Sequence, residues 1–354
     1  MKRRYLILFV MTVFVIEFLG QTSNGAYSFL DMTSSARVAA LGNTALSIYD
    51  NDIELAAYNP SLITYEMHKD VVLSYVNYYA GINYGMLQYG HHFYSDHDRG
   101  TFTATMQFHS YGSMKYADEQ GNVDGSTFTP SDFNMMIGWG RQLTPHWSIG
   151  ANVKFAGIQF ERYKTFALAA DVAASYRTDN GWMFSATARN IGYELYSNFE
   201  GDRNKLPFHL SAGISKRLEH VPFLFSVVYE NIQKWDLTYD DPLDLDGNYD
   251  AITGTTKEKS GAAKFADNLM RHIVIGGEIY IGKNLVLRAA YNYGMRQNLK
   301  TPTAKGLCGF SYGIGIRIWE LSIIYSRSEM HIYGSPNYIT ISTNLNRFFS
   351  KIIK

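Results

Sequence analysis

The chain has 354 residues with 32 basic and 32 acidic side chains, so its net charge at pH 7 is zero. It has no polybasic block, which excludes the usual electrostatic footprint of a nucleic-acid-binding protein. Its 27 Tyr and 21 Phe give a high aromatic content, and its single cysteine excludes an internal disulfide. This composition fits a soluble β-sandwich, or a barrel whose outer face meets lipid and whose inner face is polar.

The first 26 residues have the pattern of a signal peptide. Three basic residues at positions 2–4 precede an apolar run over residues 5–19. That run is shorter than the roughly 20 residues that a spanning helix needs, which argues against the alternative of a retained membrane anchor. We therefore expect residues 1–26 to be a secretory leader, cleaved after Gly20 or Ala26.

Residues 27–70 follow the leader and lack the alternation of strands. Residues 28–41 mix apolar side chains with small ones, and the acidic turn at residues 50–52 can cap a short helix that reaches Tyr58. We expect this segment to form a partly helical plug inside a barrel. The alternative is a periplasmic tail that lies beneath the barrel.

From residue 71 onward, polar and apolar side chains alternate in segment after segment, as in half-buried strands. Trp147 and Ile149 would share one face of such a strand, and Asn152 and Lys154 the other. Fourteen segments show this pattern, an even number as an antiparallel bacterial barrel requires. They lie near residues 71–80, 84–93, 99–111, 132–141, 147–157, 166–177, 182–191, 208–217, 222–231, 271–281, 285–293, 309–318, 320–327 and 338–345.

The connections between these segments fall into two classes. Those after even-numbered strands are short, and all but the first of those after odd-numbered strands are longer. Outer-membrane barrels have short periplasmic turns and longer outward loops, whereas a soluble sandwich has no reason for such sorting. We therefore predict an all-β protein in which residues 71–354 form a fourteen-stranded antiparallel transmembrane β-barrel of the outer membrane, with both termini periplasmic.

The inward positions of the predicted strands carry small side chains, for example Ala167, Ala169, Gly313 and Gly315. A barrel of fourteen strands is wide enough to need a plug or to leave a channel, which favours insertion of residues 27–70. Charged inward residues have both signs, which favours salt bridges across the lumen over the alternative of a selective pore for a polar solute. These residues are Lys154, Asp171, Arg189, Glu278, Arg288 and Arg317.

The longest connection, residues 232–270, contains an acidic and aromatic stretch. Exposed Trp and Tyr are typical anchors of protein interfaces, so we interpret this stretch as a partner-binding loop. Calcium binding is an alternative, but aligning Gly247 with the EF-hand glycine places Pro242 and Thr253 at the end positions. A solvated loop without a partner is the other alternative. The candidate partner-binding residues are Trp235, Asp236, Tyr239, Asp244, Asp246 and Tyr249.

No set of residues indicates catalysis, a cofactor or a resident metal. His109 and Ser110 are the nearest approach to a nucleophile pair, but adjacent strand residues point to opposite faces and cannot meet directly. His91 and His92 fail as a joint metal site for the same reason. We therefore expect a protein that is not an enzyme.

Two stretches of the predicted plug carry a family resemblance. S-F-L-D-M-T-S-S-A-R-V-A-A-L-G, residues 28–42, and D-N-D-I-E-L-A-A-Y-N-P-S-L, residues 50–62, closely resemble the N-terminal signature of the PorV/PorQ family of the Bacteroidetes type IX secretion system. The S-F-L opening favours the PorQ branch, and K-L-P at residues 205–207 resembles a further shared feature. The match is specific over about 40 N-terminal residues and general over the barrel. These families look like FadL-type barrels with fourteen strands and an N-terminal hatch.

The resemblance implies a non-catalytic barrel in the attachment complex of type IX secretion. Its partners would be outer-membrane lipid and lipopolysaccharide, a PorZ-like surface protein, and the neighbouring PorU/PorV sortase pair that processes cargo and attaches it to lipopolysaccharide. The residues that match the signature would build the plug and have no chemistry of their own. They are Ser35, Ala36, Arg37, Gly42, Asp52, Asn59 and Pro60.

A FadL-like channel for hydrophobic small molecules is the alternative function. It would need an apolar pocket between loops and lumen, whereas the inward positions here are mostly Ser, Gly, Ala, Asn and charged residues. The pattern therefore favours the anchor. The final residues, R-F-F-S-K-I-I-K, are expected to extend the last strand or to contact a periplasmic component.

Overall fold

The computed structural model describes residues 25–94, 99–117, 120–199, 201, 203–238, 249–250, 255–256, 260–299, 306–330 and 334–352. The predicted signal peptide lies almost wholly outside these residues. Among the described residues, no helix combines the length and the apolar character needed to cross a membrane.

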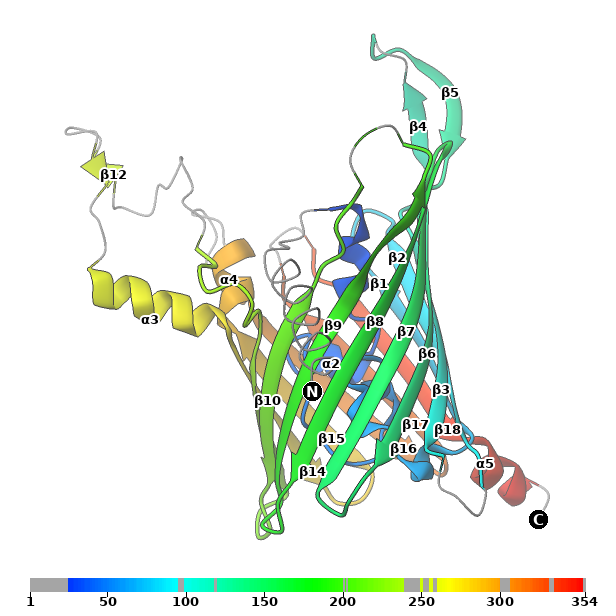
Figure 1. Cartoon of the computed structure of the whole chain (residues 1–354), viewed down its shortest axis with the longest axis vertical. Helices are drawn as coiled ribbons and strands as arrows, with labels where there is room; N and C mark the ends of the chain where they lie inside the picture. The colour runs from blue at the N-terminus through cyan, green and yellow to red at the C-terminus, as the bar shows by residue number, and fades with distance from the viewer. Residues whose placement is uncertain are drawn as a thin grey trace, which may run out of the picture.

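Fourteen strands of the described chain close into an antiparallel barrel, which confirms the predicted fold class (Figure 1). Each strand pairs with the next barrel strand along the chain, and the last pairs with the first, for example at Ile339 and Tyr75. The strands are β1 (Asp70–Asn77), β2 (Asn83–His92), β3 (Thr101–Ser110), β6 (Ser131–Gln142), β7 (Trp147–Phe160), β8 (Tyr163–Arg177), β9 (Trp182–Ser197), β10 (His209–Arg217), β11 (Phe223–Tyr229), β14 (Ile273–Ile281), β15 (Leu285–Asn292), β16 (Phe310–Ile318), β17 (Leu321–Ser328) and β18 (Asn337–Asn344).

The alternation along each strand places apolar side chains on the outer face of the barrel wall and polar or small ones on the inner face. Ile137 and Val153 point outward and are 64% and 55% exposed, whereas inward Gln88 and Asn152 are buried. A soluble protein would hide these large aliphatic side chains from water. Their exposure all round the wall therefore indicates a surface made for lipid.

Most of the longer connections lie at one end of the barrel and carry their own elements. The connection after β3 forms a hairpin of β4 (Met114–Ala117) and β5 (Val123–Phe128), which projects beyond the wall (Figure 1). The connection after β11 contains β12 (Tyr249–Asp250), β13 (Thr255–Thr256) and α3 (Gly261–Arg271), and α4 (Tyr293–Leu299) follows β15. We call this end the long-connection end, and the opposite end the short-turn end.

One expected long connection is in fact a tight hairpin. The sequence indicated a loop over residues 158–165, but β7 and β8 continue beyond the expected ends and pair as far as Phe160 and Tyr163. Glu161 adopts a left-handed backbone conformation, φ 55°, which lets two residues make the turn. The alternation of polar and apolar side chains weakens there because β7 and β8 extend beyond the membrane. Past that level, lipid no longer covers one face of the strands while the lumen covers the other.

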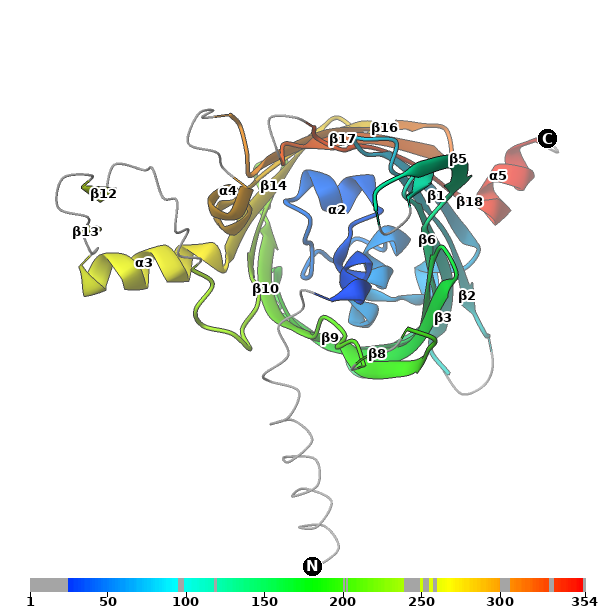
Figure 2. The ribbon, with the colours of Figure 1, turned by 90° about the horizontal axis from the view of Figure 1, so that it is seen from above.

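The N-terminal segment lies inside the barrel, which confirms the predicted plug (Figure 2). The sequence predicts a short helix from the acidic turn to Tyr58, and η2 (Ile53–Ala57) has Tyr58 as its C-cap. Its N-cap is Asp52, whose side chain accepts the amide hydrogen of Glu54. The plug consists of η1 (Ala26–Asp31), α2 (Ala36–Ala40), η2 (Ile53–Ala57), η3 (Pro60–Leu62) and η4 (Tyr65–Met67).

The plug runs from the long-connection end to the short-turn end. The Tyr27 hydroxyl donates to Thr165 near the start of β8, and the chain enters β1 at Asp70 from the other end. The final residues form helix α5 (Leu345–Ile352) at the short-turn end, so the expected extension of the last strand is wrong. The first and last described residues thus lie at opposite ends of the barrel, and the expectation that both termini are periplasmic stays a prediction.

The plug touches the wall closely where the strands lack side chains. A Cβ atom built on inward-facing Gly150 of β7 would lie 2.2 Å from the carbonyl oxygen of Pro60. This contact joins η3 to the wall near the short-turn end. Gly150 therefore provides the space that this part of the plug occupies.

Gly150→Ala is expected to destabilise the folded barrel by roughly 1–3 kcal/mol, because the new methyl group must displace plug backbone. Urea unfolding in lipid vesicles measures the change. Gly261→Ala is the matched control, since a Cβ atom there would meet nothing within 4 Å. Equal stability of the two variants would contradict the close contact.

Candidate functional site

Helix α2 carries a charged side chain into the middle of the plug. Its N-cap is Ser35, whose hydroxyl accepts the amide hydrogen of Val38, and the Ala-rich sequence of the helix favours helix formation. Arg37 lies in the first turn and is only 2% exposed. A buried guanidinium is costly unless carboxylates pair with it.

Three carboxylates surround Arg37. Its Nη1 atom is 3.0 Å from Asp50 Oδ1 and 2.6 Å from Asp52 Oδ2, both within the plug. Its Nε and Nη2 atoms each donate to one carboxylate oxygen of Glu278 on β14, at 2.9 Å. This two-point contact fixes the orientation of both groups and links the plug directly to the wall.

Glu278 has further partners on the wall. Arg288 on β15 donates through Nε at 2.6 Å, and the Tyr280 hydroxyl also donates to the Glu278 carboxylate. We refer to Arg37, Asp50, Asp52, Glu278 and Arg288 together as the plug lock. Because its charges are paired across the boundary between plug and wall, displacing the plug would leave buried charges without partners.

Glu54 lies beside the plug lock and is fully buried. The Ser35 hydroxyl donates to its carboxylate, so the residue also ties η2 to the start of α2. Burial raises the pKa of the Glu54 carboxyl to about 7, and the nearby negative charge of Asp52 raises it too. The plug therefore contains a carboxyl group that changes charge near neutral pH.

A second contact region holds the plug at the long-connection end. Asp31 accepts from His209 Nε2 at 2.8 Å and from the Asn190 amide at 3.2 Å. The Asn190 amide also donates to the carbonyl of Pro207, at 2.9 Å. Leu206 packs in a buried cluster with plug side chains that include Tyr27. The K-L-P stretch thus lies where the connection before β10 meets the plug.

All seven residues that match the family signature lie in the plug. Besides Ser35, Arg37 and Asp52, described above, the Ala36 amide donates to Thr340 on β18 at 3.0 Å. Gly42 has φ +86°, and a Cβ atom on it would lie 2.5 Å from Val274. Asn59 accepts the Ser61 amide hydrogen as the N-cap of η3, and Pro60 is the first residue of that helix.

The partner-binding candidates are only partly described. Trp235 is 46% exposed, and its ring centroid is 5.3 Å from that of Phe265 on α3. Asp236 accepts hydrogen bonds from the amide and hydroxyl of Thr238. Tyr249 belongs to β12, and Tyr239, Asp244 and Asp246 lie outside the described residues. In the part of the chain that the structure describes, no group of His, Cys, Asp and Glu residues could hold a metal ion.

His109 and Ser110 do not form a reactive pair. The His109 ring is fully buried between Phe29 and Tyr84, with centroid distances of 5.4 and 5.1 Å. Ser110 has the opposite parity on β3. The histidine therefore packs between wall and plug.

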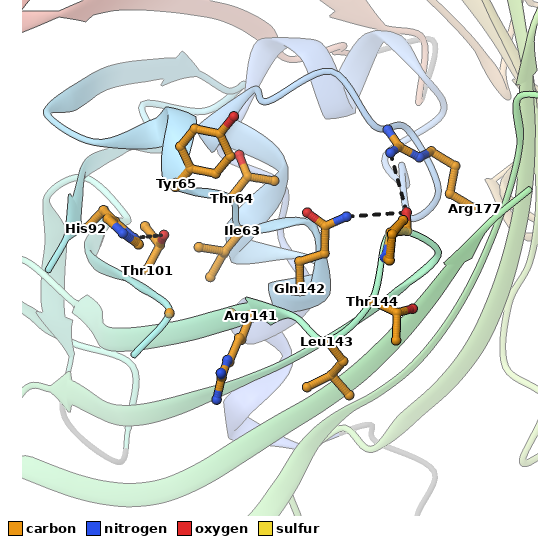
Figure 3. Close-up of a pocket in the computed structure, with 13 residues that line it drawn as sticks. Ile63, Thr64, Tyr65, His92, Thr101, Arg141, Gln142, Leu143, Thr144 and Arg177 are labelled. Atoms are coloured by element: carbon orange, nitrogen blue, oxygen red, sulfur yellow. Dashed lines mark hydrogen bonds between the residues drawn. The ribbon is translucent and has the colours of Figure 1, made fainter. Parts of the chain in front are cut away.

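A pocket of about 490 Å³ opens at the short-turn end, between the end of the plug and the wall (Figure 3). Its lining is largely polar and includes Thr101, Gln142 and Thr144. Gln142 and Arg177 both donate to the carbonyl of Pro145, at 3.3 and 3.4 Å. Small-molecule sites are usually lined mostly by apolar side chains, so this is not the pocket expected of a channel for hydrophobic molecules.

No family model matches the chain, and neither does any curated protein. Solved structures of outer-membrane channels share its fold. A TodX deltaS2S3 mutant monoaromatic hydrocarbon channel gives a TM-score of 0.52 at 11% identity, covering 88% of this chain and 99% of the other. The Pseudomonas putida toluene transporter TodX gives 0.50 at 11% identity, with 88% and 97% covered. A Pseudomonas aeruginosa FadL homologue gives 0.48 at 10% identity, with 88% and 98% covered.

At this identity the likeness to the two TodX structures concerns the fold alone. The chain is thus a closed fourteen-stranded barrel of the outer-membrane type with a plug inside it. The neighbours are channels and transporters, not enzymes.

Arg37→Ala is expected to lower the free energy of unfolding by about 3–5 kcal/mol, because it breaks the buried ion pair with Glu278, which keeps only Arg288, and removes the cation of the partly exposed Asp50 and Asp52. The shift in the urea midpoint of vesicle-embedded protein measures this loss. Arg203→Ala removes an exposed arginine from a connection and is the control. A loss no greater than that of the control would show that the plug lock contributes little to stability.

Glu54→Gln is expected to remove a pH dependence of stability. The folded-state pKa of about 7 lies above the ordinary glutamate value of about 4.3, so the folded protein binds the proton more tightly than the unfolded chain. Wild-type stability should therefore fall as pH rises between these two values, by roughly 3 kcal/mol, and the variant should lack this fall. Urea midpoints at both ends of the range test this, with exposed Glu219→Gln as control. An unchanged slope in the Glu54 variant would refute it.

Proposed function

We propose that this barrel is a non-catalytic outer-membrane anchor whose long-connection end holds a surface protein. The observation that carries the proposal is the plug lock, which ties the plug to the wall by buried, paired charges. A fixed plug turns the barrel into a rigid support. Its function would then lie in what its outer connections bind.

The contents of the lumen support the same proposal. Polar wall residues are covered by the plug instead of lining an apolar passage. The inward residues that are at most 4% exposed include Ser74, Gln88, Thr105, Asn134, Ser175, Thr187, Ser211 and Ser326. A hydrophobic molecule would gain nothing by leaving lipid for such surroundings.

The long-connection end offers the binding surface. Trp235 and Phe265, which are 46% and 57% exposed, form an aromatic pair at the base of the connection between β11 and β14. Large exposed aromatic side chains supply much of the energy in protein interfaces. The hairpin of β4 and β5 stands on the same end of the barrel (Figure 1). A partner could rest on both.

The type of partner comes from the resemblance of the plug to the PorV/PorQ signature. On that basis we propose a PorZ-like surface protein of a type IX secretion system, beside a PorU/PorV sortase pair and lipopolysaccharide. The residues that match the signature include Arg37 and Asp52, which belong to the plug lock, and Ser35, which holds Glu54. The resemblance therefore falls on the residues that fix the plug.

A channel for hydrophobic small molecules is the second candidate. The observation that favours it is the fold likeness to TodX, which is a monoaromatic hydrocarbon channel and a toluene transporter. The comparisons support this candidate more directly than they support a role in secretion. Transport through the lumen would require the plug to move, and so would break the contacts of Arg37 with Glu278.

Two measurements separate the candidates. Mild solubilisation of the outer membrane and affinity purification of a tagged chain, with an untagged control, would recover a PorZ-like protein if the barrel is an anchor. Uptake of toluene into vesicles that contain the purified barrel would occur if it is a channel. Uptake by the wild type at a rate well above empty vesicles, with no protein recovered, would overturn the anchor.

The double variant Trp235→Ala, Phe265→Ala is expected to reduce partner capture about tenfold or more, since removal of central aromatic anchors commonly costs 2 kcal/mol or more. Quantitative mass spectrometry of the co-purified partner measures this. Trp319→Ala is the control, because Trp319 is 86% exposed but lies in the turn between β16 and β17 at the short-turn end. Undiminished capture by the double variant would exclude the aromatic pair as the docking site.

A further inference from the structure

Helix α5 lies outside the barrel wall at the short-turn end (Figures 1 and 2). It begins directly after β18, whose outward residues Ile339 and Ile341 belong to the exposed apolar surface. Leu345 continues the same parity as the first residue of the helix. The helix therefore starts on the side of the wall that faces lipid.

The helix has one apolar face and one polar face. Leu345, Phe348 and Phe349 follow the i, i+3, i+4 spacing that places side chains together, while Arg347 and Ser350 lie on the other face. Phe349 is 54% exposed even though the helix follows the wall. Contact with β18 thus leaves a large aromatic side chain uncovered, which is unfavourable in water and favourable in lipid.

Hydrogen bonds fix the start of α5 to the place where the barrel closes. The Leu345 amide donates to the carbonyl of Lys69 at 2.9 Å, and Lys69 Nζ donates to Asn346 Oδ1 at 2.9 Å. The Asn344 amide group donates to Asp70 and to the carbonyl of His68, at 2.6 and 2.9 Å. Residues 68–70 join the plug to β1. These hydrogen bonds therefore hold the first residues of α5 next to the start of β1.

We propose that α5 lies in the headgroup region of the membrane leaflet at the short-turn end, with its apolar face on the acyl chains. Its occupant is phospholipid, because the apolar face continues the lipid-facing surface of β18. Arg347 adds a cation on the polar face, and Lys69, which binds the neighbouring Asn346, adds a second at the start of the helix. Two cations suit the phosphates of anionic lipids. Amphipathic helices with this arrangement bind in the plane of the interface.

Such a helix would connect the lipid leaflet to the seam between β1 and β18. Its first turn is bonded to the last residues of the plug, and its apolar face would be held by lipid. Membrane binding would therefore oppose separation of the first and last strands. The proposal concerns the end of the barrel away from the docking surface, and it does not depend on which partner binds there.

A nitroxide spin label tests the position of each face. In a Cys308→Ser background, Phe349→Cys and Ser350→Cys are labelled, and the protein is placed in vesicles of phosphatidylethanolamine and phosphatidylglycerol. Collision rates with oxygen, which concentrates in lipid, and with a water-soluble nickel complex are then compared. We expect oxygen collisions to dominate at position 349 and nickel collisions at position 350. Nickel access at both positions would overturn the proposal.

A label at position 349 that is shielded from both reagents would also overturn it, because α5 would then be covered by protein, either a second copy or a periplasmic partner.

Cys308 is buried, so a second test leaves it in place. A photo-crosslinking amino acid at position 349 of the otherwise unchanged chain repeats the test without that change. Crosslinks to phospholipid are expected, several-fold more abundant than from position 350, and equal yields would refute the assignment.

Discussion

The contact between Arg37 and Glu278 is the interaction on which the inner arrangement of this barrel depends. It joins the plug to the wall through two hydrogen bonds of 2.9 Å in a site without access to water. Asp50 and Asp52 also bind Arg37, and Arg288 also binds Glu278. Because a buried ion is stable only while its partners remain, this pair opposes displacement of the plug from the wall.

The plug lock also explains why a shared fold leaves the function open. The barrel resembles TodX in its strands, and at 11% identity the chains share little else. A barrel with a movable plug can pass solutes, whereas a barrel with a fixed plug can anchor a bound protein. Whether the plug is fixed depends on a few side chains inside the lumen. These side chains have almost no effect on the backbone fold, which is what a structural comparison measures.

Much of the fold could be predicted from the sequence because the lipid and the lumen impose different side chains at alternate positions. Each of the fourteen strands is visible in the sequence from its own residues. The partners inside the barrel are not, since Arg37 and Glu278 are 241 positions apart and nothing local marks their pairing. The hairpin at Glu161 was missed for a related reason, because β7 and β8 extend past the region where alternation is enforced. Helix α5 was missed because eight residues of mixed character are too few to exclude a strand.

The path of the plug constrains how the barrel is assembled. Residues 26–67 precede every strand in the chain, and the wall is complete only when β18, the final strand, pairs with β1. Arg37 and its wall partner Glu278 are 241 positions apart, so the two side chains can pair only after β14 has been synthesised, long after the plug residues.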